Sequence, residues 1–295
     1  MITDRNKKLS YLSLLLPAFL IYITIIIFPV IVSFGLSFTD WRHFRLKGFV
    51  GIQNYIEIFQ DPIFQIALKN NIKIMLLSVF GQIPLGIILA YLLFRKWVRG
   101  SQFFEMMIFL PITISSIVVA LLWNRVFSPV GIYTAFIRTV TDNPDYVVKI
   151  FESEQHAIVP VLFVLLWQHT SLYMIIFIAN LQRIPKSVFE AATIDGASES
   201  MIIRKIVLPA LTGVIYTCSV LAIAGSLKSF DLVFAMTGGG PVHYTYVMAL
   251  YLYQQTFTFN NYGYGSAVSI IIVILSVGLI TLFQRFFEKV SKKYN

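Results

Sequence analysis

The side chains most able to do chemistry are polar groups that interrupt long apolar stretches of the chain. They are Ser115, Ser116, Gln168, His169, Thr170, Ser226, Lys228, Ser229 and Asp231. Such groups can hydrogen-bond a polar solute, but they show no arrangement of nucleophile and base, no pair of acids and no metal-ligand spacing. Polar side chains at membrane depth are costly and usually face a bundle interior or a pathway. We interpret them as pathway candidates, and the alternative for each serine is bonding to its own backbone or helix packing.

Lys228 and Asp231 are the charged members of this set and lie three residues apart. On a helix, this spacing allows the two side chains to pair. A straight helix that starts at Leu208 would rise about 30 Å by residue 228, which places the pair near the outer surface. An outer gate and simple solvation at the interface are equal alternatives for this pair.

Composition places the chain in a membrane. Its 295 residues are 57% hydrophobic and 13% charged, whereas a soluble domain is about 25% charged. The net charge of +9 does not indicate nucleic acid, because the cations flank apolar blocks, as the positive-inside bias predicts. Cys218 is the sole cysteine, so neither an internal disulfide nor a cysteine metal site is expected.

Six apolar blocks are long enough to cross a bilayer as helices, which takes about 20 residues each. They cover residues 11–38, 72–94, 103–126, 157–181, 207–236 and 266–287. We therefore predict an all-α polytopic membrane protein with a single transmembrane domain over 1–295. Clusters of cations begin at Arg5, Arg95, Arg183 and Arg285 on one side of these blocks, and their density predicts cytoplasmic N- and C-termini.

The loop over residues 184–209, between the fourth and fifth spans, differs from the others. Pro185 suits the first turn of a short helix, because a missing N–H costs nothing there. Gly196 can take a positive φ and reverse the chain, and Ser198 can cap a second short helix. Pro209 then enters the first turn of the next span. This pattern predicts a compact helix-turn-helix on the inner membrane face.

The same loop carries a family resemblance. Glu190-Ala191-Ala192, Gly196 four residues later, and Ile206-x-Leu208-Pro209 after nine more resemble the EAA loop of ABC importer permeases. The resemblance implies a coupling helix that docks on an ATPase subunit and transmits nucleotide-driven movement to the spans. The docking residues that it implies are Glu190, Ala191, Ala192, Asp195 and Gly196.

Other motifs resemble the carbohydrate-uptake branch of these permeases. They are Gly51-Ile52-Gln53-Asn54-Tyr55, Leu110-Pro111, Trp167, and Thr237-Gly238-Gly239-Gly240-Pro241 with Thr245. The chain is similar to the larger maltose permease subunit, but in a shorter six-helix form. The pathway positions implied by that similarity are Ile112, Ser116, Leu165, His169, Leu172, Gly225, Ser226 and Ser229. Apolar residues at 112, 165 and 172 depart from the maltose pattern, so either another sugar is carried or the partner subunit holds most contacts.

The resemblance also implies partners and a location. These are a second, homologous permease in a heterodimer, an ABC ATPase dimer, an extracellular or periplasmic solute-binding protein, a sugar and membrane lipid. ATP and Mg²⁺ are expected on the ATPase, because the chain has no nucleotide-binding motif and is expected to be neither an enzyme nor a holder of a cofactor or metal. The expected location is the bacterial or archaeal cytoplasmic membrane, multi-pass. The alternatives are import of glycerol-3-phosphate or a glycerol phosphodiester, an intramembrane enzyme, and an ion-driven carrier.

Overall fold

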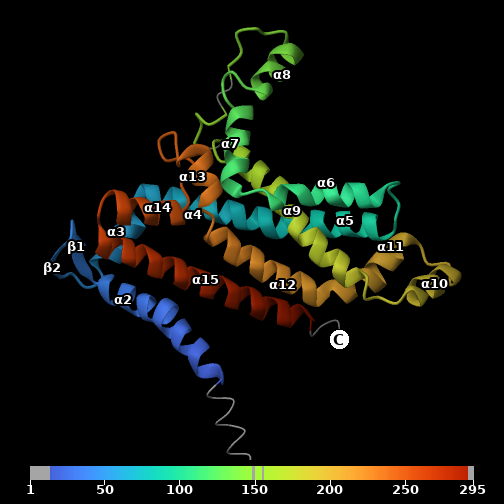
Figure 1. Cartoon of the computed structure of the whole chain (residues 1–295), viewed down its shortest axis with the longest axis horizontal. Helices are drawn as coiled ribbons and strands as arrows, with labels where there is room; N and C mark the ends of the chain where they lie inside the picture. The colour runs from blue at the N-terminus through green and yellow to red at the C-terminus, as the bar shows by residue number, and fades with distance from the viewer. Residues whose placement is uncertain (1–13, 148–149, 155, 292–295) are drawn as a thin grey trace, which may run out of the picture. The chain divides into compact units, whose positions relative to one another are not determined.

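The computed structural model describes residues 14–147, 150–154 and 156–291, and it is mostly helical (Figure 1). The α-helices are α2 (Phe28–Leu36), α3 (Gln53–Gln60), α4 (Pro62–Leu77), α5 (Ile83–Phe94), α6 (Ser101–Thr113), α7 (Ser116–Val126), α8 (Ile132–Thr141), α9 (Val159–Leu181), α10 (Lys186–Ile194), α11 (Glu199–Ile202), α12 (Leu208–Leu227), α13 (Asp231–Thr237), α14 (Met248–Tyr253) and α15 (Tyr262–Ser291). Wider π-helical turns lie at η1 (Ile23–Ile27), η2 (Ser78–Gln82), η3 (Ile203–Val207) and η4 (Gln254–Thr258).

Five helical segments of the described chain are long and apolar enough to cross a membrane, and one bent pair makes a sixth. The first, second, fourth and sixth predicted spans appear with shifted ends, as Leu14–Leu36, Pro62–Phe94, Val159–Leu181 and Tyr262–Lys289. Residues 11–13 of the first prediction lie outside the described residues. The prediction of a mostly helical chain with several membrane-spanning helices is confirmed. A short two-stranded sheet departs from the all-α class, and the location of the two termini stays a prediction.

The third predicted span, 103–126, is wrong as a single helix. It is broken into α6 and α7, which meet at an angle of 98°. Pro111 lies inside α6, where it removes a helical N–H and crowds the preceding turn. Gln168 supports the break, since its Nε2 donates to the Ile114 carbonyl at 3.2 Å and to Ser116 Oγ at 3.3 Å. A buried amide thus satisfies the carbonyl that the broken helix leaves open.

The fifth predicted span, 207–236, is also wrong in its bounds. The helix runs from Glu199 to Leu227, and the chain bends before the separate helix α13 begins at Asp231. The last turn tightens, because the Lys228 amide donates to the Gly225 carbonyl at 3.2 Å. Asn71 Nδ2 donates a hydrogen bond to the neighbouring Ser226 carbonyl at 2.7 Å. The contact from α4 therefore holds the last turn of the helix at a polar stretch, Ser226 to Ser229, through which the predicted span had continued.

Three of the π-turns precede a proline at the same distance. Pro29, Pro84 and Pro209 each occupy the second residue after η1, η2 and η3. In each case the residue between turn and proline donates to a carbonyl five residues earlier. A proline ring clashes with the carbonyl four residues before it, and the wider turn accommodates that ring without ending the helix. Pro209 is the second residue of α12 and lies in its first turn, as predicted, while α11 and η3 precede it in one continuous helical segment.

The chain divides into two compact units, and the first contains residues 1–61 and 252–274. Within it, strands β1 (Thr39–Arg42) and β2 (Arg45–Phe49) pair antiparallel. A further bridge joins Arg42 to Asn261, and the Trp41 and Tyr262 rings lie 5.3 Å apart. These contacts connect the start of the unit to the beginning of α15.

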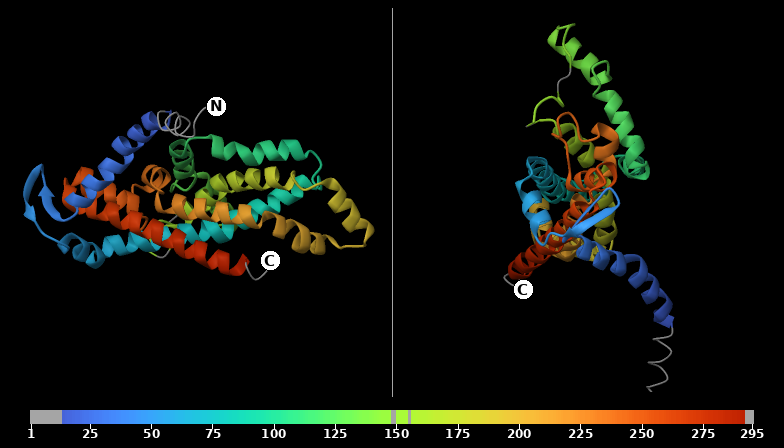
Figure 2. Two further views of the ribbon diagram at one scale, coloured as in Figure 1. Left: turned by 90° about the horizontal axis from the view of Figure 1, so that it is seen from below. Right: turned by 90° about the vertical axis from the view of Figure 1, so that its left-hand side faces the viewer.

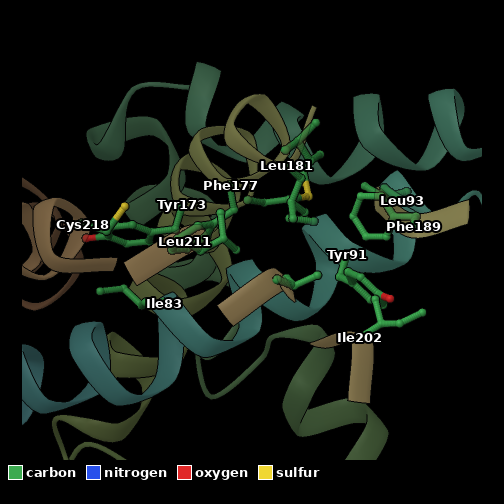
Figure 3. Packing of buried hydrophobic residues seen from close by; sticks show 14 of the residues in the cluster. Ile83, Tyr91, Leu93, Tyr173, Phe177, Leu181, Phe189, Ile202, Leu211 and Cys218 are labelled. Atoms are coloured by element: carbon green, nitrogen blue, oxygen red, sulfur yellow. The ribbon is translucent and has the colours of Figure 1, made fainter. Parts of the chain in front are cut away.

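The second unit contains residues 62–251 and 275–295. Its core is formed by α5, α9 and α12, which lie side by side (Figures 1 and 2). Figure 3 shows Tyr173, Phe177 and Leu211 among the buried residues of this core. Close approach of α5 to α9 depends on Gly86, where an added Cβ would lie 2.9 Å from Tyr173 Cβ. Small residues allow this kind of backbone contact between membrane helices.

Candidate functional site: an intramembrane cavity and a helical loop

A cavity of about 220 Å³ opens within the second unit. Its walls come from the α4–η2 segment, α7, α9, α12 and the bend before α13. The lining residues are Ile74, Ser78, Gln82, Ser116, Leu165, His169, Tyr173, Ala222, Gly225, Ser226, Lys228, Ser229, Phe230, Asp231 and Leu232. Hydroxyl, amide, imidazole and aromatic groups thus share one cavity although they come from distant parts of the sequence.

The structure places most of the predicted pathway residues around this cavity. Those that line it are Ser116, Leu165, His169, Gly225, Ser226 and Ser229. Ile112 lies before the break in α6–α7 and does not line it. Leu172 is 40% exposed and also lies outside the cavity lining. The role of all eight residues in solute passage stays a prediction.

Several cavity hydroxyls and amides already have partners within the chain. Ser226 Oγ donates to the Ile223 carbonyl at 2.8 Å, which is the backbone bonding expected as the alternative for a membrane serine. Gln82 Nε2 donates to the Leu165 carbonyl at 2.9 Å. The His169 ring interacts with the backbone of Leu165, and its buried Nδ1 makes no hydrogen bond of normal geometry. His169 is therefore a group that a solute could engage.

Two asparagines of α4 that the sequence analysis passed over hold the cavity region together. Asn71 Oδ1 accepts from the Met248 amide at 2.7 Å, while its Nδ2 binds the Ser226 carbonyl. Asn70 Nδ2 donates to the carbonyls of Tyr244 and Tyr246 at 2.8 and 2.9 Å. The sequence signal for these residues was a pair of adjacent asparagines just before an apolar block. The predicted span began at residue 72, so both asparagines lay outside it.

Lys228 and Asp231 do not form the pair that their spacing allowed. Among the described residues the ion pairs are Arg42–Asp40 and Arg95–Glu199. Lys228 follows the last residue of α12, and Asp231 begins α13, so the two do not share a helix. Both are exposed and line the cavity. Each charge is therefore free to face a solute or water.

The predicted helix-turn-helix is present as α10 and α11 at one end of the second unit (Figures 1 and 2). Gly196 has a φ of +74°, the left-handed conformation that favours glycine. The Ala197 amide donates to the Ala192 carbonyl at 2.9 Å, and the Gly196 amide to the Thr193 carbonyl at 3.1 Å. This pair of bonds is a Schellman motif, which satisfies carbonyls at the end of α10. Ser198 stands at the start of α11, but its side chain makes no capping bond.

The residues of the EAA motif do not all face the same way. Glu190, Ala191, Asp195 and Gly196 are exposed, whereas Ala192 is partly buried against the core of the second unit. The residue that anchors α10 is Phe189, which is 5% exposed. The sequence analysis missed it, although a large aromatic residue in a short helix with small and polar neighbours was the signal. The loop therefore has an anchored face and a free face.

Two of the motifs that resemble carbohydrate permeases have structural roles. In the first unit, Asn54 Nδ2 donates to the Ser37 and Thr39 carbonyls at 2.8 and 3.1 Å, and Tyr55 OH lies 2.7 Å from Ser37 Oγ. In the second unit, the hydroxyls of Thr237 and Thr245 lie 2.7 Å apart. Both motifs thus hold turns in one conformation.

Tyr246 closes the glycine-rich loop of the second unit. Gly239 has a φ of +89°, and its Cα faces the Tyr246 ring so closely that a side chain there would overlap it. The Thr245 hydroxyl donates to the Gly240 carbonyl at 3.0 Å. Burial raises the pKa of Tyr246 above its ordinary value. This loop is therefore closely packed, with a neutral phenol at its centre.

The described residues contain no cluster of histidine, cysteine, aspartate or glutamate that could hold a metal ion. The cavity offers hydrogen bonds, two exposed charges and aromatic surface from Tyr173 and Phe230. Such an arrangement can bind a polar solute transiently.

Comparison with known proteins agrees with this geometry. The chain is 31% identical over 252 residues to the probable ABC transporter permease protein YurN of Bacillus subtilis, covering 84% of this chain and 85% of that protein. It is 32% identical over 254 residues to the multiple sugar-binding transport system permease protein MsmF of Streptococcus mutans, covering 83% of each chain.

A solved structure shares the fold. It belongs to a bacterial ABC transporter involved in the import of the acidic polysaccharide alginate, with a TM-score of 0.82, 20% identity, and coverage of 97% of this chain and 98% of that chain. The model of the binding-protein-dependent transport system inner membrane component family matches residues 82–293, which include the loop and all the cavity-lining residues except Ile74 and Ser78. The chain therefore belongs to the family of inner membrane components of binding-protein-dependent transport systems, the permease subunits of ABC importers.

Proposed function

We propose that this chain forms half of the translocation pathway of an ABC importer for a sugar or oligosaccharide, coupled to ATPase subunits through α10 and α11. The observation that carries the proposal is the free face of the loop. Glu190, Ala191, Asp195 and Gly196 are exposed at the end of a helical unit whose other surface anchors Phe189. A turn held by backbone bonds, with Ala191 and Gly196 leaving room for close approach, suits docking against another protein.

The cavity supports a sugar as the solute. A sugar ring has an apolar face and a polar rim, so aromatic surface beside hydroxyl and amide groups suits it. The cavity has one lysine and one aspartate, hence no excess of positive charge. Glycerol-3-phosphate or a glycerol phosphodiester would favour a cationic pathway, and is therefore the weaker alternative. The name of MsmF and the alginate importer of the same fold support the carbohydrate class.

The importer would need partners. We infer a second, homologous permease, an ATPase dimer that binds ATP and Mg²⁺, and a solute-binding protein outside the cytoplasmic membrane of a bacterium or archaeon. The family description as a binding-protein-dependent system supports this assembly. We infer that hydrolysis takes place on the partner, and the lack of a nucleotide-binding motif in this chain's sequence is consistent with that inference.

Purification from native membranes tests the assembly. A tagged copy of the chain is expected to co-purify with one different permease and two ATPase subunits. Proteoliposomes of that complex should take up labelled oligosaccharides only with MgATP and the solute-binding protein. Equal uptake without ATP, or by this chain alone, would contradict the proposal. Uptake of labelled glycerol-3-phosphate in preference to every sugar tested would agree with the importer assignment but contradict a sugar as its solute.

Topology is tested separately with single cysteines and a membrane-impermeant maleimide. Replacements at Asp142 and Asn261 should be labelled from outside intact cells, and a replacement at Ser198 only after the membrane is opened. Ser198 precedes α11 in the loop. Labelling at Ser198 from outside would refute a cytoplasmic docking loop.

A further inference from the structure

The carboxylate of Glu199 connects the start of α11 to the end of α5, more than one hundred residues earlier in the chain. Tyr91 OH donates to Glu199 Oε2 at 2.5 Å, and the Arg95 guanidinium forms an ion pair with Glu199 Oε1. An ion pair with this exposure, 25% for Arg95 and 36% for Glu199, would be weak by itself. The phenol adds a charge-assisted hydrogen bond from a ring that is 5% exposed. Both carboxylate oxygens are thus held at the end of α5, by Tyr91 of its last turn and by Arg95, the residue that follows it.

A second contact joins the same two regions. The Phe189 ring of α10 lies 5.5 Å from the Phe94 ring, and the Arg95 guanidinium lies 5.7 Å from the Phe189 centroid. Arg95 therefore contacts both helices of the loop, α10 through the ring and α11 through the carboxylate. In Figure 3, Tyr91, Leu93, Phe189 and Ile202 appear together at this end of the core.

Two helical paths lead from these contacts to the cavity. One runs back along α5 to η2, whose Ser78 and Gln82 line the cavity. The other runs forward from α11 through η3 and α12 to Gly225 and Ser226, which also line it. Each path includes a π-turn two residues before a proline. Such turns interrupt regular helical hydrogen bonding and can act as flexible points.

We propose that Glu199 is a positioning residue that makes the docking loop move together with α5, so that movement of the loop reaches the cavity along both paths. The inference rests on the proposed function, because it presupposes an ATPase on the free face. Without the carboxylate, the loop would remain joined to α12 by the chain itself but would lose its polar attachment to α5. Movement of the loop would then be transmitted less completely along α5, whereas the exposed face of the loop that docks on the ATPase would stay unchanged.

The experiment reads the α5 path directly and needs no knowledge of the solute. A Ser78→Cys replacement is introduced into the complete transporter, and its labelling by a water-soluble maleimide is measured without nucleotide and after trapping with MgATP and vanadate. Cys218 is 0% exposed, and the transporter without Ser78→Cys gives its background. With Glu199 intact, trapping is expected to change the labelling rate about fivefold or more.

Glu199→Ala is expected to reduce that change to less than about twofold, while the amount of co-purified ATPase stays the same. Tyr91→Phe removes one donor and keeps the ring, so it should give an intermediate change. The combination with Glu199→Ala should be no worse than Glu199→Ala alone, since both act through one carboxylate. Glu288→Gln is the matched control: it is an exposed acid near a helix end whose hydrogen-bond partner is Gln284, and it should behave like the unaltered protein.

The outcomes separate the two proposals. If the unaltered transporter shows no nucleotide-dependent labelling or retains no ATPase, the proposed function fails and the positioning role fails with it. If Glu199→Ala keeps the full nucleotide-dependent change, the positioning role alone is refuted. If Glu199→Ala loses the ATPase, Glu199 is a docking residue and the positioning role is again refuted. Where Glu199→Ala lowers membrane abundance, Tyr91→Phe provides the same comparison with a smaller perturbation.

Discussion

The docking loop and the cavity belong to the same helical unit but are built in opposite ways. The loop, α10 to α11, takes its shape from bonds between residues five or fewer positions apart, around Gly196. The cavity is assembled from segments far apart in the sequence. Asn71 binds Ser226 across 155 positions and Met248 across 177. The turn of the loop is therefore formed locally, whereas the cavity exists only after the helices pack.

This difference predicts how each region responds to substitution. A change in the loop should alter docking and coupling while the helices stay inserted, because lipid and helix packing do not depend on the turn. A change between the helices should remove the cavity together with the fold. A change that points into the cavity itself should spare both assembly and docking. Substitutions of glycine test this difference, because the space available for an added side chain varies widely from one glycine to another.

The largest effect is expected for Gly86→Val, between α5 and α9. Its Cβ would lie 2.9 Å from Tyr173 Cβ and 3.1 Å from the Met174 amide nitrogen, so the backbones would have to separate. Overpacking of this kind costs about 2 kcal/mol or more, and we expect loss of folded protein in detergent. The measurement is monodisperse yield and thermal stability on size-exclusion chromatography. Gly213→Val is the control, since nothing lies within 4 Å of its added Cβ; equal loss in both would refute the packing role.

An intermediate effect is expected for Gly196→Val in the loop. Nothing lies within 4 Å of an added Cβ, but the φ of +74° is strained for a β-branched residue, at a cost of about 1 kcal/mol or more. Membrane abundance should stay normal, while ATPase co-purification and uptake per ATP fall about tenfold. Gly196→Asn, which tolerates this conformation, should retain most of both. Glu190→Ala should be milder still, because an exposed charge contributes little. Normal coupling in Gly196→Val would contradict the loop's role.

The narrowest effect, confined to the solute, is expected for Gly225→Leu. Gly225 lines the cavity, and nothing lies within 4 Å of an added Cβ, so the new side chain would start in open space and reduce the volume of the cavity. Abundance and basal ATP hydrolysis should stay within about twofold of normal, while sugar uptake falls about tenfold. Gly213→Leu in the same helix is the matched control. Unchanged uptake in Gly225→Leu, and in bulky replacements of Ser116 and Ser229, would move solute contacts to the partner subunit.

Much of the architecture could be predicted from apolar length and proline and glycine placement, because these act locally. Four spans were located this way, and the loop's helices and its positive φ follow from the residues around Gly196. The bounds of the other two spans could not be predicted. Ile114 is apolar, and apolar residues resume after Lys228 and continue to Met236, so hydropathy marked neither helix end. Where each helix stops is influenced by amides from other helices, Gln168 and Asn71.

By itself, the sequence determined that the chain crosses a membrane several times and carries a short, glycine-turned loop, because hydropathy and backbone preference are properties of neighbouring residues. The tertiary structure decided which polar groups meet. It joined Ser78, His169 and Ser229 in one cavity, separated Lys228 from Asp231 by a bend, and brought Glu199 to Tyr91 and Arg95. Hydrogen bonds between distant segments form only when the helices pack, and that packing cannot be predicted from the spacing of residues along the chain.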